Sequence, residues 1–379
     1  MKVRLGDYIQ EYSVKNKDDE NISVYSVTNT KGFCKDYFGK EVASKDKTTY
    51  KIVPYGYFAY NPSRINVGSV DWQRKEKKVI VSPLYNVFSV SPDLERQYLY
   101  YYLKSDFVLQ RIKAVSTGSV RDNLKLSMLY EFPIELPALE KQRKIVKILD
   151  RVSDIIEKKQ QELEQLDTLV KSRFAEMFGD IGTGIFNFGT CKLGDVARVG
   201  SSHRVFTTEF VESGIPFYRG TEIGELANGQ KPSEPYYISE EHYERLANDD
   251  TKPLIGDLLM PSICNKGQVW MVDTEEPFYY KDGRVLCISP DRRVFNSKFL
   301  QYFMREKTLV EYSKIGSGST FAEFKIFLLK NMDVLIPPRE IQEQFAAFVH
   351  QVDKSKSKIQ KSLEETQLLF DSLMQKYFG

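Results

Sequence analysis

Two stretches of the chain repeat apolar residues at alternating spacings of four and three, which is typical of a helix that buries one stripe. One stretch follows Pro137 and the other Pro337. Proline suits the first helical turn because its missing N–H is not needed there. Lys159, Lys356 and Thr366 interrupt the stripes. The apolar positions are Ile145, Leu149, Val152, Ile156, Leu163, Leu166 and Val170 in the first stretch, and Phe345, Val349, Val352, Ile359, Leu363, Phe370, Leu373 and Tyr377 in the second.

A helix of about 40 residues is about 60 Å long, and an isolated stripe of this kind would face water. We therefore expect the two helices to pack on each other. The order domain, helix, domain, helix favours antiparallel packing, as a rigid rod with a globular domain at each end and an approximate two-fold axis. The alternative is that one or both stripes bind an external partner, and the two interpretations are compatible.

The rest of the chain alternates short β-branched and aromatic runs with Gly and Pro, which predicts strands bounded by turns. Residues 78–82 and 284–289 are two such strands, while 94–110 and 299–312 have helical spacing. The predicted fold class is therefore α+β. Two duplicated domains of mixed helix and strand content are separated by two long helices that form an antiparallel coiled coil.

The chain also contains an internal repeat. Residues 137–179 and 337–379 share twelve identities at an offset of 200, from Pro137 to Gly179. The repeat extends upstream, where Gly56 matches Gly256 and, at an offset of 199, Pro62 matches Pro261. One long unit has been duplicated. We predict four segments: a globular domain over 1–136, a helix over 137–179, a second domain over 180–336 and a second helix over 337–379.

Composition restricts the function classes. The chain has 379 residues, with 54 basic and 52 acidic side chains, so its net charge of +2 does not fit a protein held to DNA by bulk charge. No apolar run approaches the roughly 20 residues of a membrane span, and no signal peptide is recognisable. The four cysteines form no CxxC pair and the three histidines are scattered, so we expect reduced thiols, no metal site and a cytoplasmic location.

The absence of recognisable catalytic motifs favours a chain that has no catalytic activity. There is no phosphate-binding G-x-x-x-x-G-K-[ST] loop and no G-x-G-x-x-G after a strand. The run 60–63, Tyr-Asn-Pro-Ser, has only part of the Asn-Pro-Pro-aromatic signature of adenine methyltransferases. We expect no cofactor in this chain, although a self-contained nuclease or methyltransferase remains a rival interpretation.

Two pairs of duplicated loops are candidates for binding DNA, because Asn can read adenine and Arg guanine with paired hydrogen bonds. The alternative is that their polar groups only satisfy their own turns. The first pair supplies Asn61, Ser63, Arg64 and Asn66, and in the second copy Ser262, Asn265 and Lys266. The second pair, rich in small residues that suit a phosphate backbone, supplies Ser119 and Arg121, and in the second copy Ser319.

Charge is distributed unevenly between the domains. Residues 1–136 hold 21 basic and 16 acidic residues, a net of +5, whereas residues 180–336 hold 18 and 22, a net of −4. A net negative domain binds DNA weakly by itself, because affinity depends largely on neutralising phosphates. If the second domain binds DNA, Arg204, Arg219 and Lys266 must cluster on one face, or a partner must supply further charge.

The duplicated helix starts resemble the conserved regions of type I restriction-modification specificity subunits. The resemblance rests on the run Glu135–Ile145, on the ending Lys171–Asp180, and on a Pro followed by Glu and Gln that occurs twice, ending at Gln142 and Gln342. The resemblance covers essentially the whole chain, including the order of domains and helices. It does not identify which loop residues contact DNA.

The resemblance implies two target recognition domains, each of which reads half of a split double-stranded DNA sequence, probing the major groove where base edges differ. It implies that the paired helices act as a ruler and hold two modification subunits, which bind S-adenosylmethionine and methylate adenine. Restriction subunits would add ATP- and magnesium-dependent translocation and cleavage. The alternative function is a non-catalytic coiled-coil scaffold that joins protein partners without sequence-specific DNA binding.

Overall fold

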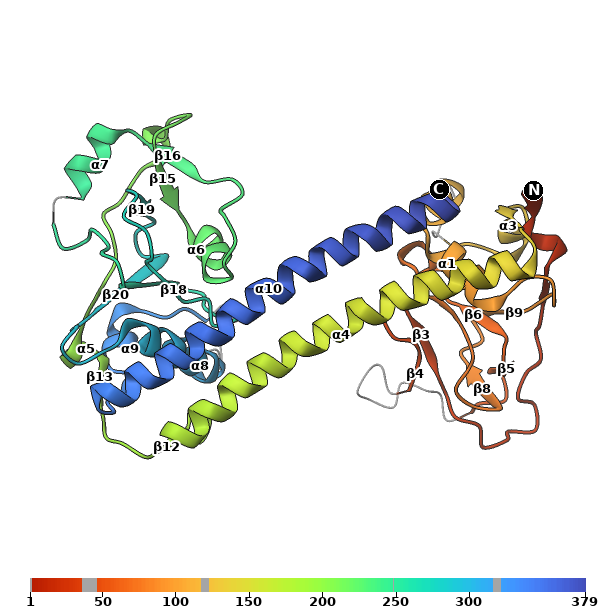
Figure 1. Ribbon diagram of the computed structural model, residues 1–379, viewed down its shortest axis with the longest axis horizontal. Coiled ribbons are helices and arrows are strands. Elements are labelled where there is room, and N and C mark those ends of the chain that lie inside the picture. The colour runs from red at the N-terminus through yellow and green to blue at the C-terminus, as the bar shows by residue number, and fades with distance from the viewer. Residues whose placement is uncertain (1, 36–45, 117–122, 248, 316–321) are drawn as a thin grey trace. The chain divides into compact units, whose positions relative to one another are not determined.

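The computed structural model describes residues 2–35, 46–116, 123–247, 249–315 and 322–379 (Figure 1). It divides into two compact units. Unit 1 consists of Met1–Glu162 and Ile359–Gly379, and unit 2 of Leu163–Lys358. The two longest helices, α4 (Leu139–Phe178) and α10 (Arg339–Phe378), have 40 residues each, and each contributes to both units. No helix among the described residues is both long enough and apolar enough to cross a membrane.

Unit 1 is built on an antiparallel sheet in the order β2-β9-β6-β7, to which two further strand pairs, β3-β4 and β5-β8, are added. The pair β1-β10 joins the beginning of the chain to the residues before α4. The strands are β1 (Lys2–Arg4), β2 (Ile9–Glu11), β3 (Ser26–Thr28), β4 (Gly32–Cys34), β5 (Lys51–Pro54), β6 (Phe58–Tyr60), β7 (Val70–Trp72), β8 (Lys78–Val81), β9 (Asn86–Val90) and β10 (Pro133–Glu135). The helices are η1 (Leu5–Asp7), η2 (Ile65–Val67), α1 (Arg96–Lys104), α2 (Asp106–Ser116) and α3 (Leu126–Tyr130).

Unit 2 repeats this sheet as β14-β20-β17-β18 and adds a second sheet, β16-β15-β19. Its strands are β11 (Gly179–Asp180), β12 (Ile185–Phe186), β13 (Thr190–Lys192), β14 (Ala197–Gly200), β15 (Ile215–Tyr218), β16 (Tyr236–Ile238), β17 (Leu258–Pro261), β18 (Trp270–Met271), β19 (Tyr279–Tyr280), β20 (Val285–Pro290) and β21 (Asp333–Leu335). Its helices are α5 (Leu193–Val196), η3 (Thr207–Glu209), α6 (Gly220–Ala227), α7 (Glu240–Leu246), α8 (Ser297–Ile315) and α9 (Ile326–Lys330).

The sequence repeat is a structural repeat. Phe58 pairs with Phe88 in unit 1, and Leu258 pairs with Ile288 in unit 2, which are the same positions at the offset of 200. The central strands β6 and β17 are buried throughout, as expected for strands covered on both faces. One face of each sheet packs on an equivalent helix, α1 in unit 1 and α8 in unit 2.

The opposite faces of the two sheets are covered differently. Ala59 and Val87 pack on Val53 and Val79 of the β5-β8 pair in unit 1. In unit 2 the corresponding face, with Leu259, packs on helix α6 and on strand β19. The helix-facing halves of the units are therefore alike, and the units differ in the elements that cover the other half.

Each unit contains a pair of antiparallel helix segments. In unit 1, Ile145 and Leu149 of α4 share an apolar cluster with Met374 and Phe378 of α10. In unit 2 the ring centres of Phe178 and Phe345 are 5.4 Å apart, and Lys356 forms an ion pair of 2.7 Å with Asp167. Residues later in α4 therefore contact residues earlier in α10, as antiparallel packing requires. Phe178 with Phe345 corresponds, at the offset of 200, to Phe378 with Ile145, so both units use the same packing.

Two buried glutamines explain the repeated helix start. Gln142 accepts a hydrogen bond from the Glu95 N–H (2.8 Å) and donates to the carbonyls of Asp93 and Pro137. Gln342 does the same in unit 2, with the N–H of Asn296 (2.9 Å) and the carbonyls of Val294 and Pro337. Both side chains are 0% exposed, so each locks the start of a long helix to the loop before the domain's own helix.

The predicted strands at 78–82 and 284–289 are confirmed as β8 and β20. The predicted helix over 94–110 is wrong in its continuity, because the chain breaks at Ser105 into α1 and α2. Ser105 has extended dihedral angles, and its hydroxyl donates to the Tyr102 carbonyl (2.8 Å). A serine that satisfies the end of one helix and starts the next is a local signal that the apolar spacing does not reveal.

Candidate nucleic-acid interface

The first candidate loop leaves strand β6 and returns to β7. The Asn61 side chain accepts hydrogen bonds from the Ser63 N–H (3.1 Å) and hydroxyl (2.9 Å), so its oxygen stabilises the turn itself. Arg64 is exposed and forms no ion pair with a described residue, and Asn66 is half-buried. The loop therefore combines an internal turn around Asn61 with a free guanidinium at Arg64.

The equivalent loop of unit 2 lies between β17 and β18. Ser262 is buried, and its backbone donates to the Arg284 carbonyl (2.8 Å). Asn265 and Lys266 are exposed, and the Lys266 N–H donates to the side chain of Gln268 (3.0 Å). Of the three residues predicted to contact DNA in this loop, the last two have side chains that can reach a ligand, whereas Ser262 is enclosed.

Both loops are tied to the chain at the same point. The Pro62 carbonyl accepts from the Leu124 N–H (3.1 Å), and the Ser262 carbonyl accepts from the Phe324 N–H (2.7 Å). These pairs correspond at the offset of 200. The strand pairing then differs by one residue. Ala59 pairs with Asp71, whereas Leu259, which lies 200 residues later, pairs with Trp270 and not with residue 271. The loop of unit 2 is thus one residue shorter between the paired strands, and Val70 corresponds to Val269 at an offset of 199.

The second candidate pair of loops falls outside the described residues. Ser119, Arg121 and Ser319 cannot be placed, and their contribution stays a prediction. The described residues that follow them, Leu124 and Phe324, are the ones that anchor the first pair of loops. In each unit, a residue shortly after the second candidate loop therefore donates a backbone hydrogen bond to the first candidate loop.

The basic residues predicted in unit 2 differ in their surroundings. Arg204 is exposed and lies over the ring of Phe206 at 5.2 Å. Arg219 precedes α6, whose Gly220 lies against Pro261 at the start of the loop. The Arg219 guanidinium is paired with the buried carboxylate of Glu222 and stacks on Tyr236 at 4.4 Å.

Electrostatics therefore reduce the charge that Arg219 can offer to DNA. Burial raises the pKa of the Glu222 carboxyl, but hydrogen bonds from Arg219 outweigh burial and hold that pKa below its ordinary value. The carboxylate stays ionised and neutralises Arg219 at neutral pH. Arg204 and Lys266 are the predicted cations of unit 2 that remain without an ion pair to a described residue.

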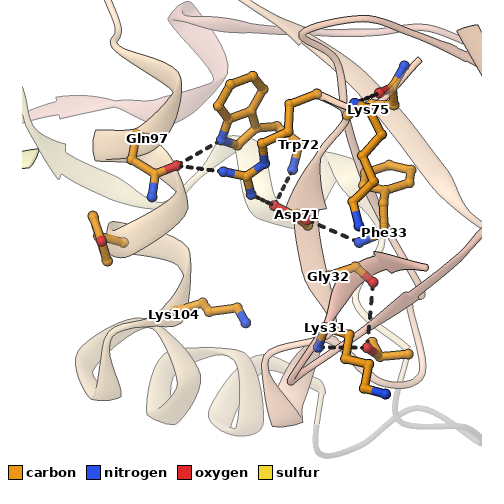
Figure 2. A network of polar contacts seen from close by, with 12 residues as sticks. Lys31, Gly32, Phe33, Asp71, Trp72, Lys75, Gln97 and Lys104 are labelled. Carbon is orange, nitrogen blue, oxygen red and sulfur yellow. Dashed lines mark hydrogen bonds and ion pairs between the residues drawn. The ribbon is translucent and has the colours of Figure 1, made fainter. Parts of the chain in front are cut away.

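Sequence reasoning missed a polar cluster in unit 1 (Figure 2). The buried Asp71 accepts hydrogen bonds from the Phe33 N–H (3.1 Å), the Trp72 N–H (2.8 Å) and the Arg74 guanidinium. Gln97 of α1 accepts from Arg74 (3.1 Å) and from the Trp72 indole (3.0 Å). Its amide donates to Asp150 of α4 (3.2 Å), so the cluster runs from the β3-β4 hairpin to the long helix.

Two cations of this region share one aromatic ring. Arg74 lies 5.6 Å and Lys104 5.0 Å from the centre of Tyr100, whose pKa burial raises to about 12. Arg74 also stacks on Trp72 at 4.5 Å. The only sequence signal is the close spacing of Trp72, Arg74 and Lys75, which is too common to be selected without the fold.

The helix surface contains both buried and exposed apolar residues. Along the predicted stripes, Ile156, Leu163, Leu166, Ile359, Leu363, Phe370 and Leu373 are half-buried, and Ile145, Leu149, Val152, Val170, Phe345, Val349 and Val352 are buried. Outside the stripes, Leu169 is 48% and Leu369 51% exposed, at equivalent positions of the repeat. Ile148 and Ile155 of α4 are also exposed.

The described residues contain no cluster of three or more His, Cys, Asp or Glu side chains that could hold a metal ion. The two candidate loops, one in each unit, are attached by equivalent backbone hydrogen bonds.

Comparisons with known proteins agree with the repeat. The model of the type I restriction modification DNA specificity domain matches residues 3–167 and again 187–366. A putative type I restriction enzyme specificity subunit of Haemophilus influenzae is 26% identical over 275 residues, 71% of this chain and 67% of its own. The MjaIX specificity subunit of Methanocaldococcus jannaschii is 25% identical over 301 residues, 74% of this chain and 67% of its own.

Two solved structures share the fold along the whole chain. The S subunit of a type I restriction-modification system from M. genitalium superposes with a TM-score of 0.58 at 15% identity, covering 100% of this chain and 96% of that one. A chain from a type I R-M complex superposes with a TM-score of 0.57 at 19% identity, covering 100% and 97%. The sequence match to the domain occurs once in each half of the chain, as the duplication requires.

Proposed function

Because the chain belongs to the family of type I restriction-modification DNA specificity proteins, we propose that it reads a double-stranded DNA sequence split into two halves, one half with each unit. One observation carries this proposal: both units hold the same loop by the same hydrogen bond, Leu124 to Pro62 and Phe324 to Ser262, while the loop tips differ. A shared frame with different tips suits two readers of different bases.

In this proposal, each loop approaches base edges in the major groove. Arg64 is the exposed side chain that contacts bases in unit 1, and Asn265 and Lys266 have this role in unit 2. Arg204 contacts the phosphate backbone of the DNA. Asn61 shapes the turn, because its oxygen is already occupied by Ser63. Helices α4 and α10 serve as the spacer between the half-sites.

The chain itself performs no reaction in this scheme, and its partners supply the chemistry. Two methyltransferase subunits would bring S-adenosylmethionine and extrude the target adenine. Restriction subunits would add ATP- and magnesium-dependent translocation. The equivalent exposure of Leu169 and Leu369 supports two copies of one partner, since each repeat then offers the same apolar contact.

The experiment replaces residues 180–336 by the matching segment of a relative that recognises another sequence. The chimaera is co-expressed with its modification subunit in a host without other adenine methylation. Methylated positions are mapped by single-molecule sequencing. We expect one half of the methylated motif to change and the other half to stay the same, because each unit has its own core and its own loop.

A change in both halves would contradict separate reading by the two units. Methylation without any sequence motif, or equal affinity of the wild-type complex for all duplexes, would favour the scaffold function. Turnover by the purified chain alone, with DNA, magnesium and S-adenosylmethionine, would favour a self-contained enzyme. As a matched control, the reciprocal exchange of residues 1–136 should change the other half of the motif.

A further inference from the structure

We propose that Arg74 and Lys104 form a binding site, here called the seat, for one phosphate of the DNA backbone, with Lys31 on the adjoining β3-β4 turn. The proposal rests on DNA binding by the chain and adds a site in unit 1 outside the loop 61–66. All three side chains come from different elements: the β3-β4 turn, the connection after β7, and the last residue of α1.

The seat brings like charges together. Arg74 and Lys104 lie over the same Tyr100 ring, at 5.6 and 5.0 Å. Arg74 is balanced by Asp71, but Lys104 has no carboxylate partner within ion-pair distance among the described residues. Its ammonium donates to the Asn29 carbonyl (2.6 Å). Asp71 attracts the Lys104 ammonium and Arg74 repels it, and a bound phosphate would supply a direct anionic partner.

Burial removes part of the water that would solvate the Lys104 ammonium. Loss of solvation lowers the pKa of Lys104, Asp71 raises it, and Arg74 lowers it by a smaller amount. A phosphate near the ammonium would favour its charged form. Figure 2 shows the Lys104 side chain extending from its helix toward the turn that carries Lys31 and Gly32.

The seat is built rigidly. Asp71 is 4% exposed and holds the turn through the Phe33 N–H, and Gly32 has a positive φ of 56°. A Cβ on Gly32 would collide with the Asp71 carboxylate at 2.0 Å, so only glycine allows the turn to approach this closely. Because the turn is locked, Lys31 and the carbonyl that binds Lys104 keep their positions before DNA arrives.

Unit 2 has an acidic residue in place of Arg74 and keeps a cation in place of Lys104. The strand register aligns Arg74 with Asp273, and the glutamine anchors align Lys104 with Arg305, whose neighbour Glu306 lies within 3.9 Å of its guanidinium. The seat is therefore a property of unit 1, which agrees with the net charge of +5 over residues 1–136 against −4 over 180–336.

The experiment measures how DNA affinity depends on salt. The full complex with its modification subunits is titrated with the duplex found by methylation mapping, and with duplexes in which one half-site is scrambled, between 50 and 300 mM NaCl. The variants are Lys104→Met, which keeps the apolar stem, Lys104→Arg, Lys31→Gln, and the matched control Arg305→Met in unit 2. Each lost phosphate contact should lower the slope of log K against log salt by about 0.9.

For Lys104→Met we expect a slope lower by about 0.9, a similar loss of affinity for every duplex, and unchanged discrimination between duplexes. Lys104→Arg should restore the slope, Lys31→Gln should lower it by a smaller amount, and Arg305→Met should leave it unchanged. Because Lys31 is exposed, its variant tests the seat even if Lys104→Met does not fold.

An unchanged slope in both Lys104→Met and Lys31→Gln would overturn the seat. Lost discrimination in Lys104→Met would assign Lys104 to a base instead of a phosphate, which also overturns it. Stabilisation of the wild type, but not of Lys104→Met, by millimolar inorganic phosphate with an unchanged DNA slope would identify a free-phosphate site. If the wild type does not discriminate between duplexes, the proposed function fails, whereas the slopes still decide the seat.

Discussion

Gln142 and Gln342 show how one side chain can serve a repeated structural task. Each is fully buried and makes one accepted and two donated hydrogen bonds to backbone groups that have left water. A buried group that loses its partner costs about 1–3 kcal/mol. The motif that carries the family resemblance is therefore explained by the attachment of the long helix to its domain.

We predict that Gln142→Leu lowers the free energy of unfolding of unit 1 by about 2–4 kcal/mol, because the Glu95 N–H and two carbonyls lose their partner. Urea denaturation, followed through the fluorescence of Trp72 in a Trp270→Phe background, measures the change. Gln160→Leu, at an exposed position of the same helix, is the control and should cost less than about 0.5 kcal/mol. A loss as small as the control's would show that Gln142 does not anchor the helix.

At this scale the sequence identifies residue types but not their partners. Arg219 and Arg64 are equally plausible DNA contacts in the sequence, yet Glu222 neutralises Arg219 while Arg64 is exposed. Asn61 is a candidate adenine reader in the sequence, and its side-chain oxygen also accepts hydrogen bonds from Ser63. Which side chains meet depends on how the strands and helices pack, and no local spacing contains that information.

At the scale of elements, the interruptions of the apolar stripes form polar contacts with the facing helix. Lys159 donates to the Ser362 carbonyl (2.9 Å) and hydroxyl (2.6 Å) and to the Thr366 hydroxyl (2.8 Å) within unit 1. Lys356 pairs with Asp167 within unit 2. Polar groups inside such a seam fix the register at some cost in stability.

We predict that Thr366→Val lowers the free energy of unfolding by about 1 kcal/mol, because Lys159 loses an acceptor. In a Lys159→Met background the same substitution should have almost no effect, so the coupling energy of the double-mutant cycle should be about 1 kcal/mol. Thr168→Val is the matched control, since Thr168 makes the same hydrogen bond to its own helix, to Glu164 (2.9 Å), but is exposed. A coupling near zero would mean that the polar contacts do not stabilise the pair.

The long helices were predictable because an apolar stripe that continues over many helical turns is a strong signal. The internal duplication shows the same stripe in two segments of the chain. The strands β8 and β20 were predictable for a related reason, since short β-branched runs between turns have few alternatives. The break between α1 and α2 was not, because apolar spacing continues through Ser105. The second sheet of unit 2, β16-β15-β19, was also hidden, because β19 joins β15 from 62 residues further along the chain, as the pairing of Phe217 with Tyr279 shows.

At the scale of the whole molecule, duplication explains what is shared and what differs. The helix-facing halves of the units, with the glutamine anchors and the paired helices, are alike because both must join the same type of seam. The opposite halves are built from different strands and helices, so their residues can change without altering the helix attachment. If the opposite halves read DNA as proposed, the helices and the candidate loops can be altered independently.

We predict that removing one heptad from each helix shortens the spacer of the DNA target and leaves both half-sites unchanged. Residues 158–164 of α4 and 359–365 of α10 face each other, as the pairs Lys159–Ser362 and Asp167–Lys356 indicate, so their joint deletion keeps the register and the phase of both stripes. Seven residues correspond to about 10 Å of helix, or about three base pairs.

Methylation mapping of the double deletion, co-expressed with its modification subunit, measures the spacer directly. Deletion from α4 alone is the control, because it leaves seven residues of α10 unmatched, and we expect it to abolish methylation by disrupting the pairing. A double deletion that methylates with an unchanged spacer would show that the helices do not set the distance between half-sites. A changed half-site would show that the helices and the reading surfaces are not independent, since no residue of either candidate loop has been removed.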